Sequence, residues 1–184
     1  MEADDGTAWW IEAGLAELAN GGVDRVRVEV LATSLGVTKG GFYRRFKDRR
    51  ALLDALLETW SRGRIAALEK QIEQGGKSAR DRLESLIRLY SERVSAQGMA
   101  IELAIRQWAR SDSSAAAAAA TVDAARLRNV AQLYRQLGLG AQDAEARAVL
   151  FYSFIFGQSL LFLDQAARKR ASLATACTSV LTEI

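Results

Sequence analysis

A cluster of basic side chains marks residues 38–50 as the part of this chain best suited to chemistry. The stretch holds six Lys or Arg and one acid, a net charge of +5, whereas residues 1–37 hold two bases and seven acids, a net charge of −5. The overall charge of +3 therefore conceals a local cationic patch. Gathered guanidinium and ammonium groups bind phosphates, so the cluster predicts binding to a polyanion. The alternative is a solvated basic face on an ordinary pair of helices, which charge runs alone usually indicate.

Catalytic and metal-binding residue types are scarce in the rest of the chain. There is no His and a single cysteine, Cys177, so the common zinc-ligand sets, His-based triads and an intramolecular disulfide are all unavailable. The sequence also lacks a phosphate-loop motif and a clustered set of carboxylates. We therefore expect no enzyme activity, no metal and no cofactor. The lone thiol and the acidic opening of the chain favour the cytoplasm over secretion.

Two short helices joined by a tight turn are expected to position the basic cluster. The apolar residues between positions 28 and 35 follow the i, i+3, i+4, i+7 spacing of one helical face, and Gly36 stands where a turn needs a residue that tolerates positive φ. Thr38 then occupies the N-cap position of a second helix. Phe42 and Phe46, four residues apart, would pack this helix on the first. The opposite, exposed side would carry Lys39, Tyr43, Arg44 and Arg45.

Residues 21–60 resemble the DNA-binding domain of TetR-like transcriptional regulators. The family pattern reads apolar-Ala-x-x-apolar-Gly-Val-Ser/Thr-x-Gly-x-aromatic-Tyr-x-x-Phe-x-x-Lys/Arg-x-x-Leu, and it spans about a fifth of the chain. The rest of the chain is consistent with the family's divergent ligand-binding domain. The matching positions are Leu31, Ala32, Leu35, Gly36, Val37, Thr38, Gly40, Phe42, Tyr43, Phe46, Arg49 and Leu52.

The resemblance implies that the second short helix enters the major groove of double-stranded DNA. We expect the phosphate backbone to be held by a set of basic and hydroxyl side chains around that helix. The set comprises Lys39, Tyr43, Arg44 and Arg49, with Arg45 and Lys47 as helpers and Thr38 contributing its hydroxyl.

Two departures from the family pattern concern the same region. Arg27 stands where a hydroxyl cap is common, and we expect its guanidinium to reach a phosphate instead. Gly41 stands beside Gly40, where the family often has a small hydroxyl residue. Two helical glycines cost about 1 kcal/mol each relative to Ala, so a short recognition helix is expected. Without a Cβ, both positions would allow a close approach to the base edges.

Composition and periodicity predict an all-α chain of about nine helices. Proline is absent, although average usage of ~5% would predict roughly nine prolines. We expect a three-helix helix-turn-helix DNA-binding domain over residues 1–50, joined by a long helix to a helical ligand-binding and dimerisation bundle over residues 51–184. Apart from the two short helices, the predicted helices begin at Thr7, Asp48, just after Ser78, after a break at Gln97-Gly98, near Ala115, at Asp143 and near Ser172, and the last two end at Leu163 and Glu183.

The most apolar part of the chain is residues 148–163. Its 16 residues fall short of the ~18 to 20 that a membrane span needs, so we expect no membrane segment. A helix that is apolar on nearly all sides must be buried in its own domain or partly against another chain. The resemblance implies a homodimer formed through the last two helices. We expect Phe154 and Leu161 in the interface, and the alternative for either residue is a place in the protein's own core.

Candidate ligand-contacting residues lie in the C-terminal half. Tyr90, Trp108 and Gln158 are the preferred candidates for the pocket of a small apolar or aromatic effector, although core packing is the alternative for the two aromatic residues. Glu102 and Arg106 are four residues apart and are interpreted as a surface salt bridge. Asp123 and Arg126 complete the set of polar candidates.

These observations favour a DNA-binding transcriptional regulator. The preferred hypothesis is a homodimeric repressor that binds an inverted-repeat operator and is released by a ligand. The alternative is a helical DNA-binding regulator without a small-molecule pocket, which is either constitutive or controlled by a protein partner. An enzyme is the third class, and no constellation of residues supports it.

Overall fold

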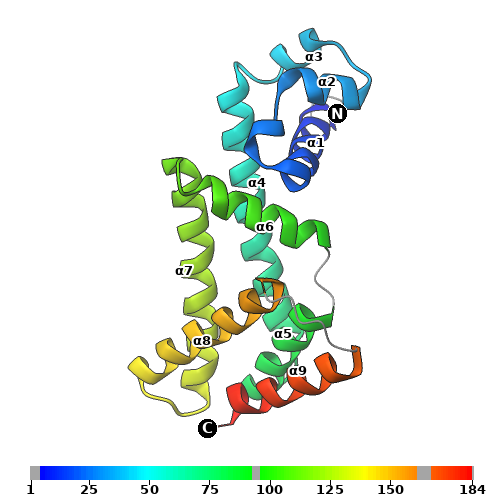
Figure 1. The fold of residues 1–184 in the computed structure, drawn as a ribbon. Helices are drawn as coiled ribbons and strands as arrows, with labels where there is room; N and C mark the ends of the chain where they lie inside the picture. Colours follow the sequence, from blue (N-terminus) through cyan, green and yellow to red (C-terminus); the bar gives the residue numbers. More distant parts are fainter. Residues whose placement is uncertain (1–4, 93–95, 161–166, 184) are drawn as a thin grey trace. The chain divides into compact units, whose positions relative to one another are not determined.

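The computed structural model describes residues 5–92, 96–160 and 167–183, and these residues are entirely helical or connecting (Figure 1). Nine α-helices and one 3-10 turn are present in them, which confirms the predicted all-α fold and the expected number of helices. The elements are α1 (Asp5–Gly21), η1 (Val23–Arg25), α2 (Val28–Leu35), α3 (Lys39–Tyr43), α4 (Arg49–Gln74), α5 (Ala79–Glu92), α6 (Ala96–Trp108), α7 (Ser113–Gln136), α8 (Ala141–Leu160) and α9 (Ala167–Thr182).

Several helix ends depart from the prediction. Thr7 lies inside α1, which is already helical at Asp5, so it is not the N-cap. The expected break at Gln97-Gly98 is the first turn of α6 instead. A single helical glycine costs only about 1 kcal/mol, and the carbonyl of Gly98 accepts a hydrogen bond of 2.6 Å from Nη2 of Arg64. The last helix begins at Ala167 because the residues before Ser172 are good helix formers. The predicted end of the preceding helix, Leu163, lies outside the described residues.

Other helix ends follow the cap residues that the sequence predicted. Gly36 adopts the left-handed conformation, with φ of 65°, and closes α2. The Asp48 carboxylate accepts a hydrogen bond of 2.9 Å from the amide of Ala51 at the start of α4. Ser78 and Asp81 cap α5 reciprocally, each backbone amide donating to the other's side chain at 3.1 Å. The hydrogen bond from the Ser78 amide to the Asp81 carboxylate is the main cause that lowers the pKa of Asp81.

The helices form two compact units. Unit 1 comprises residues 1–64 and 95–122, and unit 2 comprises residues 65–94 and 123–184. The unit that contains the helix-turn-helix therefore also contains α6 and the first part of α7, and α1 packs directly on α6. The division at residue 50 into DNA-binding and ligand-binding parts stays a prediction.

The core of unit 1 holds α1 against α4. Gly14 permits this close approach, because a Cβ at that position would lie 2.9 Å from Cδ2 of Leu56. Leu31 and Phe42 bring α2 and α3 into the same core, where both side chains are fully buried. Burial of these apolar side chains stabilises the arrangement by roughly 1.5–3 kcal/mol each.

The core of unit 2 is built by α5, α7 and α8, with Leu181 of α9 packed against it (Figure 1). The fully buried Tyr134 of α7 donates a hydrogen bond of 2.9 Å from its hydroxyl to the carbonyl of Leu181. Burial raises the pKa of Tyr134 to about 12, so its hydroxyl remains a donor at neutral pH. Arg147 of α8 donates to the carbonyl of Glu183 at 2.7 Å. Two polar contacts therefore fix the C-terminal end of α9.

Candidate nucleic-acid interface

The short helix α3 is anchored through its aromatic side. The ring of Phe42 is fully buried and lies 5.3 Å from Trp10 of α1 in an edge-to-face arrangement. Phe46, just after the helix, stacks on Phe42 with the ring centroids 5.4 Å apart. Both phenylalanines are buried, and the ring contact of Phe42 is with α1, whereas the spacing predicted packing on α2. Because one side of α3 is held in the core, its other side must face outward.

The outward side carries the residues that the sequence assigned to it. Tyr43 is 61% exposed, and the side chains of Lys39 and Arg44 are exposed as well. Thr38 is the N-cap of α3 by its extended backbone, yet its hydroxyl makes no capping hydrogen bond and remains available. Within the part of the chain that the structure describes, the side chain of Arg44 makes no hydrogen bond or ion pair. The exposed side chains of Arg27 and Lys47 likewise have no such contact with the described residues.

Lys39 forms an ion pair with an exposed glutamate, Glu29. Its Nζ lies 2.7 Å from Oε1 of Glu29 on α2, and both side chains are more than half exposed. The hydrogen bond from Lys39 lowers the pKa of Glu29. Exposed pairs of this kind contribute little to stability, because water screens the charges and two long side chains must be ordered. A phosphate can therefore replace Glu29 as the partner of Lys39.

Arg45 turns toward its own unit. One guanidinium nitrogen, Nη1, donates to the carbonyl of Gly41 at 3.2 Å. The same guanidinium covers Gly6 of α1 so closely that a Cβ at Gly6 would overlap it. Arg45 therefore contacts α1, and it would have to leave this position to reach a phosphate.

The two glycines of α3 have open space around them. A Cβ at Gly40 would meet only the hydroxyl oxygen of Thr38, at an ordinary distance of 3.6 Å, and a Cβ at Gly41 would meet nothing within 4 Å. Neither glycine has positive φ. Nothing among the described residues therefore requires glycine at either position.

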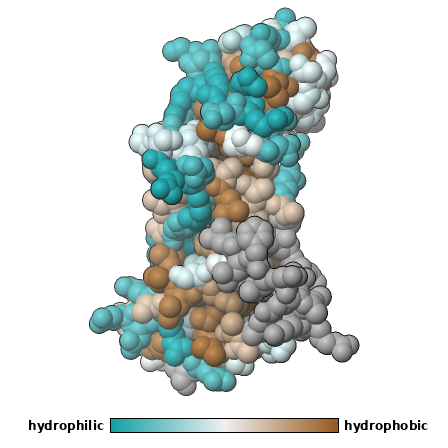
Figure 2. Space-filling view, viewed as in Figure 1, coloured by the Kyte–Doolittle hydropathy of each residue, from teal (hydrophilic) through white to brown (hydrophobic). Residues whose placement is uncertain are grey.

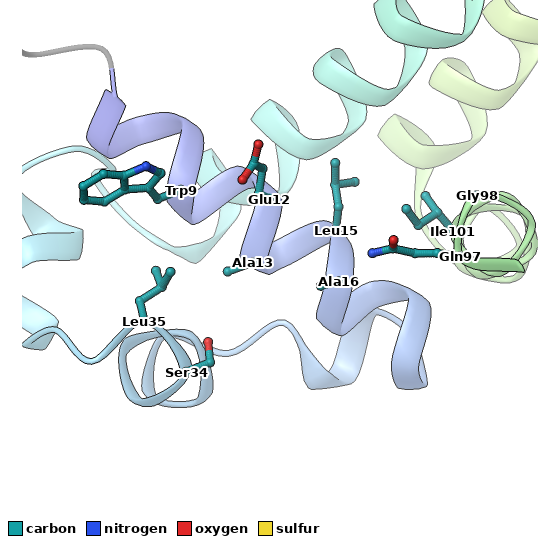
Figure 3. A pocket seen from close by; sticks show the side chains of 10 residues that line it. All are labelled: Trp9, Glu12, Ala13, Leu15, Ala16, Ser34, Leu35, Gln97, Gly98 and Ile101. Atoms are coloured by element: carbon teal, nitrogen blue, oxygen red, sulfur yellow. The ribbon is translucent and has the colours of Figure 1, made fainter. Parts of the chain in front are cut away.

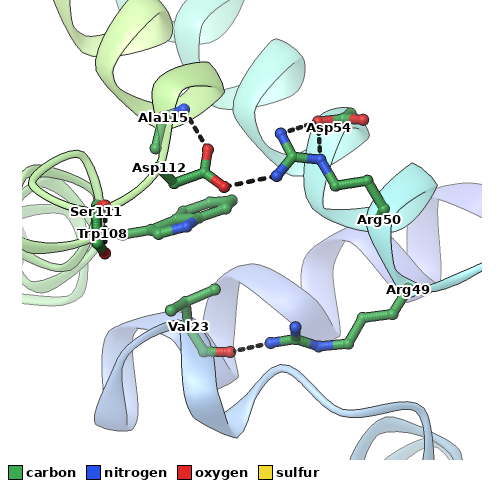
Figure 4. Close-up of polar contacts among 8 residues, drawn as sticks. All are labelled: Val23, Arg49, Arg50, Asp54, Trp108, Ser111, Asp112 and Ala115. Carbon is green, nitrogen blue, oxygen red and sulfur yellow. Dashed lines mark hydrogen bonds and ion pairs between the residues drawn. The ribbon is translucent and has the colours of Figure 1, made fainter.

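Arg49 and Arg50 begin α4, and their guanidinium groups turn to different elements (Figure 4). Arg49 donates from Nε to the carbonyl of Val26 at 2.5 Å and from Nη2 to the carbonyl of Val23 at 2.6 Å. Arg50 lies 2.6 Å from Asp112, just before α7. Sequence reasoning missed both sets of contacts, because a backbone carbonyl has no residue signature and Asp112 is 62 positions away.

Arg50 belongs to a small network of ion pairs and hydrogen bonds. Arg50 also pairs with Asp54 at 2.8 Å, one turn along α4. Asp112 in turn accepts a hydrogen bond of 2.9 Å from the amide of Ala115 and thereby caps α7. The hydrogen bond from Arg50 lowers the pKa of Asp112, and the same bond raises the pKa of Arg50.

The predicted ligand residues are distributed over the two units. Trp108 is buried in unit 1, whereas Tyr90 is half-buried in unit 2, with its ring 6.4 Å from that of Tyr152. Gln158 belongs to α8, but its side chain lies outside what the structure describes. Among the predicted interface residues, Phe154 packs partly buried on the core of unit 2, and Leu161 lies outside the described residues.

The predicted salt bridge between Glu102 and Arg106 is present, but its expected place on the surface is wrong. Glu102 is only 2% exposed, and its carboxylate lies 2.9 Å from Nη2 of Arg106. A second cation, Arg64 of α4, lies 3.6 Å from the other carboxylate oxygen. A buried carboxylate needs to be paired with a cation. Helix spacing could not predict the second arginine, because it lies on a different helix. Arg126 is also buried, with its guanidinium 5.2 Å from the Phe156 ring centroid.

Each unit has an open groove among its described residues. The first, of about 670 Å³, runs between α1, α2 and the start of α6 in unit 1 (Figure 3). The second, of about 630 Å³, lies in unit 2 beside the end of α4. Neither groove includes Tyr90 or Trp108. The first is lined by Trp9, Glu12, Ala13, Leu15, Ala16, Ser34, Leu35, Gln97, Gly98 and Ile101.

Large apolar side chains are exposed on the two C-terminal helices. Leu150 of α8 is 60% exposed, its neighbour Val149 is also exposed, and Val180 of α9 is 71% exposed. In the face drawn in Figure 2, hydrophilic residues predominate over the helix-turn-helix, and hydrophobic residues reach the surface of unit 2.

No helix among the described residues combines the length and apolar character that crossing a membrane requires. Within the same residues, no group of three or more His, Cys, Asp or Glu could hold a metal ion.

Known proteins resemble this chain at its N-terminus in sequence and over its length in fold. Residues 11–56 match the family model for bacterial regulatory proteins of the tetR family, and no curated protein matches the chain. A putative TetR-family transcriptional regulator from Rhodococcus sp. is 23% identical, with a TM-score of 0.73, over 97% of this chain and 99% of that chain. A putative transcriptional regulator from Saccharomonospora viridis, in complex with choline, is 16% identical, with a TM-score of 0.78, over 97% and 96% of the two chains. One from Pseudomonas aeruginosa PAO1 is 18% identical, with a TM-score of 0.73, over 99% and 92%.

Proposed function

We propose that the chain is a TetR-like transcriptional regulator, specifically a homodimeric repressor that binds an inverted-repeat operator and is released by a small ligand. The observation that supports this most is the exposed basic face of α3, opposite the buried ring of Phe42. A helix anchored on one side and cationic on the other has the geometry to enter a major groove.

The proposed DNA contacts fall into two groups, according to whether the side chain already has an intramolecular partner in the free protein. Arg44, Lys47 and Arg27 are ready to hold phosphates, together with the hydroxyl groups of Thr38 and Tyr43. Lys39 and Arg45 bind DNA after exchanging their intramolecular partners. Gly40 and Gly41 face the base edges.

Dimer formation is proposed through α8 and α9. A five-residue recognition helix contacts too few base pairs to select a genomic site, and a two-fold partner doubles the contacts one or more helical turns away. The exposed Leu150 and Val180 support an interface on these two helices, because a second chain would remove both from water. Phe154 and Leu161 are the interface residues proposed from the sequence.

Ligand release requires the effector to bind more tightly to the conformation that does not fit DNA. A small apolar or aromatic compound is proposed, with Tyr90, Trp108 and Gln158 as contacts. The choline complex of the S. viridis protein supports a small-molecule effector for this fold. The second candidate is a regulator without a small-molecule pocket, either constitutive or controlled by a protein.

The experiment that tests this function is selection of bound DNA from a random pool. The expected product is an inverted repeat, and recovery of no preferred sequence would contradict a specific operator. The complex is then challenged with a metabolite library. A compound that releases the DNA must bind the free protein more tightly than the complex, by reciprocity. Equal affinity for both forms rules a compound out as the effector, and a library with no releasing compound favours the second candidate.

A variant of Arg44 tests the phosphate contacts directly. Arg44→Ala should weaken binding to all sequences and reduce the slope of log affinity against log salt by ~1 for each protomer bound. Arg80→Ala is the matched control, because Arg80 is exposed in the first turn of α5 and far along the chain from the basic cluster. Equal salt slopes for the two variants would contradict the assignment of Arg44.

A further inference from the structure

The two hydrogen bonds of Arg49 join the two ends of the segment that carries α2 and α3. Val26 lies two residues before α2, and Arg49 is the first residue of α4, after α3. Nε and Nη2 of one guanidinium reach the carbonyls of Val26 and Val23, which are 23 and 26 positions earlier in the chain. The planar guanidinium thereby closes residues 26–49 into a loop that contains the whole helix-turn-helix.

Of the two carbonyls, that of Val26 is a poor partner to exchange for a phosphate, whereas Val23 is only half-buried. Val26 is fully buried, so its carbonyl would have no water to take the place of the guanidinium. Leaving a buried carbonyl without a donor costs its full desolvation, which exceeds the small net gain from a typical hydrogen bond. Lys39 differs, because its carboxylate partner is exposed and water can solvate it after the exchange.

We propose that Arg49 is a positioning residue, which fixes how α3 is presented to DNA, and that it does not hold a phosphate. This inference rests on the proposed DNA binding. It reverses the role that the sequence pattern implies for a basic residue at this position. The side chain acts through Val23 and Val26 on α2 and, through the turn at Gly36, on α3.

Four variants of the full chain separate a positioning residue from a phosphate contact, with Arg44 as the matched position. Arg49→Lys retains the charge but cannot donate to two carbonyls in fixed directions. We expect this variant to lose at least tenfold in affinity for the selected operator, with unchanged salt slope and unchanged affinity for non-specific DNA. Arg49→Gln should lose specific affinity in the same way. Arg44→Gln should instead lower the salt slope by ~1 for each protomer and weaken both kinds of DNA, and Arg44→Lys should retain the slope.

Amide hydrogen exchange gives a readout that does not depend on DNA. In Arg49→Lys, exchange should quicken in residues 26–46 and remain unchanged in α5. If Arg49 only stabilises the fold, Arg49→Lys should lower the midpoint of thermal unfolding but leave operator affinity unchanged well below that temperature. This result would overturn the proposal. It is also overturned if Arg49→Lys binds like the unmodified protein while Arg49→Gln lowers the salt slope. If the proposed function is wrong, the unmodified protein itself should select no preferred DNA sequence. If only this inference is wrong, the unmodified protein should bind its operator, and only the Arg49 variants should depart from the expected results.

Discussion

At the scale of single residues, the two glycines of α3 are not required by the fold, and we explain them by DNA binding. Gly40 and Gly41 lie in a helix with ordinary backbone angles, and no described atom prevents a Cβ at either position. In a helix, glycine is disfavoured relative to alanine. The pair therefore weakens α3 without any gain inside the protein, and we attribute its presence to close contact with DNA.

This argument predicts opposite effects on stability and binding at Gly41. Gly41→Ala should stabilise the protein by up to about 1 kcal/mol, measured by urea unfolding, while specific DNA binding falls. Gly40→Val should abolish specific binding with little change in circular dichroism. Gly63→Ala is the control, because a Cβ at Gly63 in α4 also meets nothing within 4 Å, and it should stabilise the chain without affecting DNA binding. Normal DNA binding by Gly41→Ala and Gly40→Val would contradict a groove-facing position.

At the scale of elements, Asp112 serves two helices of unit 1. It caps α7 through the amide of Ala115 and pairs with Arg50 of α4 at 2.6 Å. The two roles can be separated by substitution, because Asn retains a capping oxygen and loses the charge. The start of α7 is thus tied to the helix that directly follows the recognition helix.

We predict that Asp112→Asn destabilises the protein by at most about 1 kcal/mol at neutral pH, since the Arg50 side chain is 44% exposed and the pair is screened. The pKa of Asp112 is lowered on folding, so the stabilisation from its charge is fully present above 3.8, the ordinary value, and is lost as pH falls through the lowered pKa. The difference between variant and unmodified protein should therefore shrink as pH is lowered below 3.8 in urea titrations. A pH-independent difference would mean that the cap, not the charge, is responsible.

At the scale of the whole molecule, the assembly depends on what covers the apolar residues of α8 and α9. Leu150 and Val180 expose more than half of their surface, although both lie on helices whose other sides form the core of unit 2 or pack on it. Exposed leucine alone is common on protein surfaces. Its occurrence on both helices that the sequence assigned to dimerisation makes a second copy the expected occupant.

Leu150→Glu should convert the dimer into monomers with unchanged helicity, because the side chain is already 60% exposed in one chain. Sedimentation at micromolar concentration measures the change, and operator affinity should fall with it. Phe154→Glu should lower the thermal midpoint too, since Phe154 also packs on the core. Val37→Glu places the same charge at an exposed residue of unit 1 and should remain dimeric. A stable monomer of the unmodified protein would reject the dimer.

The sequence by itself determined what depends on neighbours along the chain. The amphipathic spacing of α2, the left-handed turn at Gly36 and the caps at Asp48 and Ser78 act within a few residues, so each could be predicted and each is confirmed. The buried side of α3 and its exposed basic side follow from the same periodicity. The family pattern of residues 11–56 is likewise local.

Only the tertiary structure decided which distant groups meet. The grouping of α6 with the N-terminal helices, the second arginine beside Glu102 and the carbonyl partners of Arg49 all join positions more than twenty residues apart. Such contacts have no period in the sequence, and a carbonyl is the same group at every residue, so residue types could not identify these partners. For that reason the sequence could mark Arg49 as basic and well placed, whereas its role in holding the helix-turn-helix was visible only once the chain had folded.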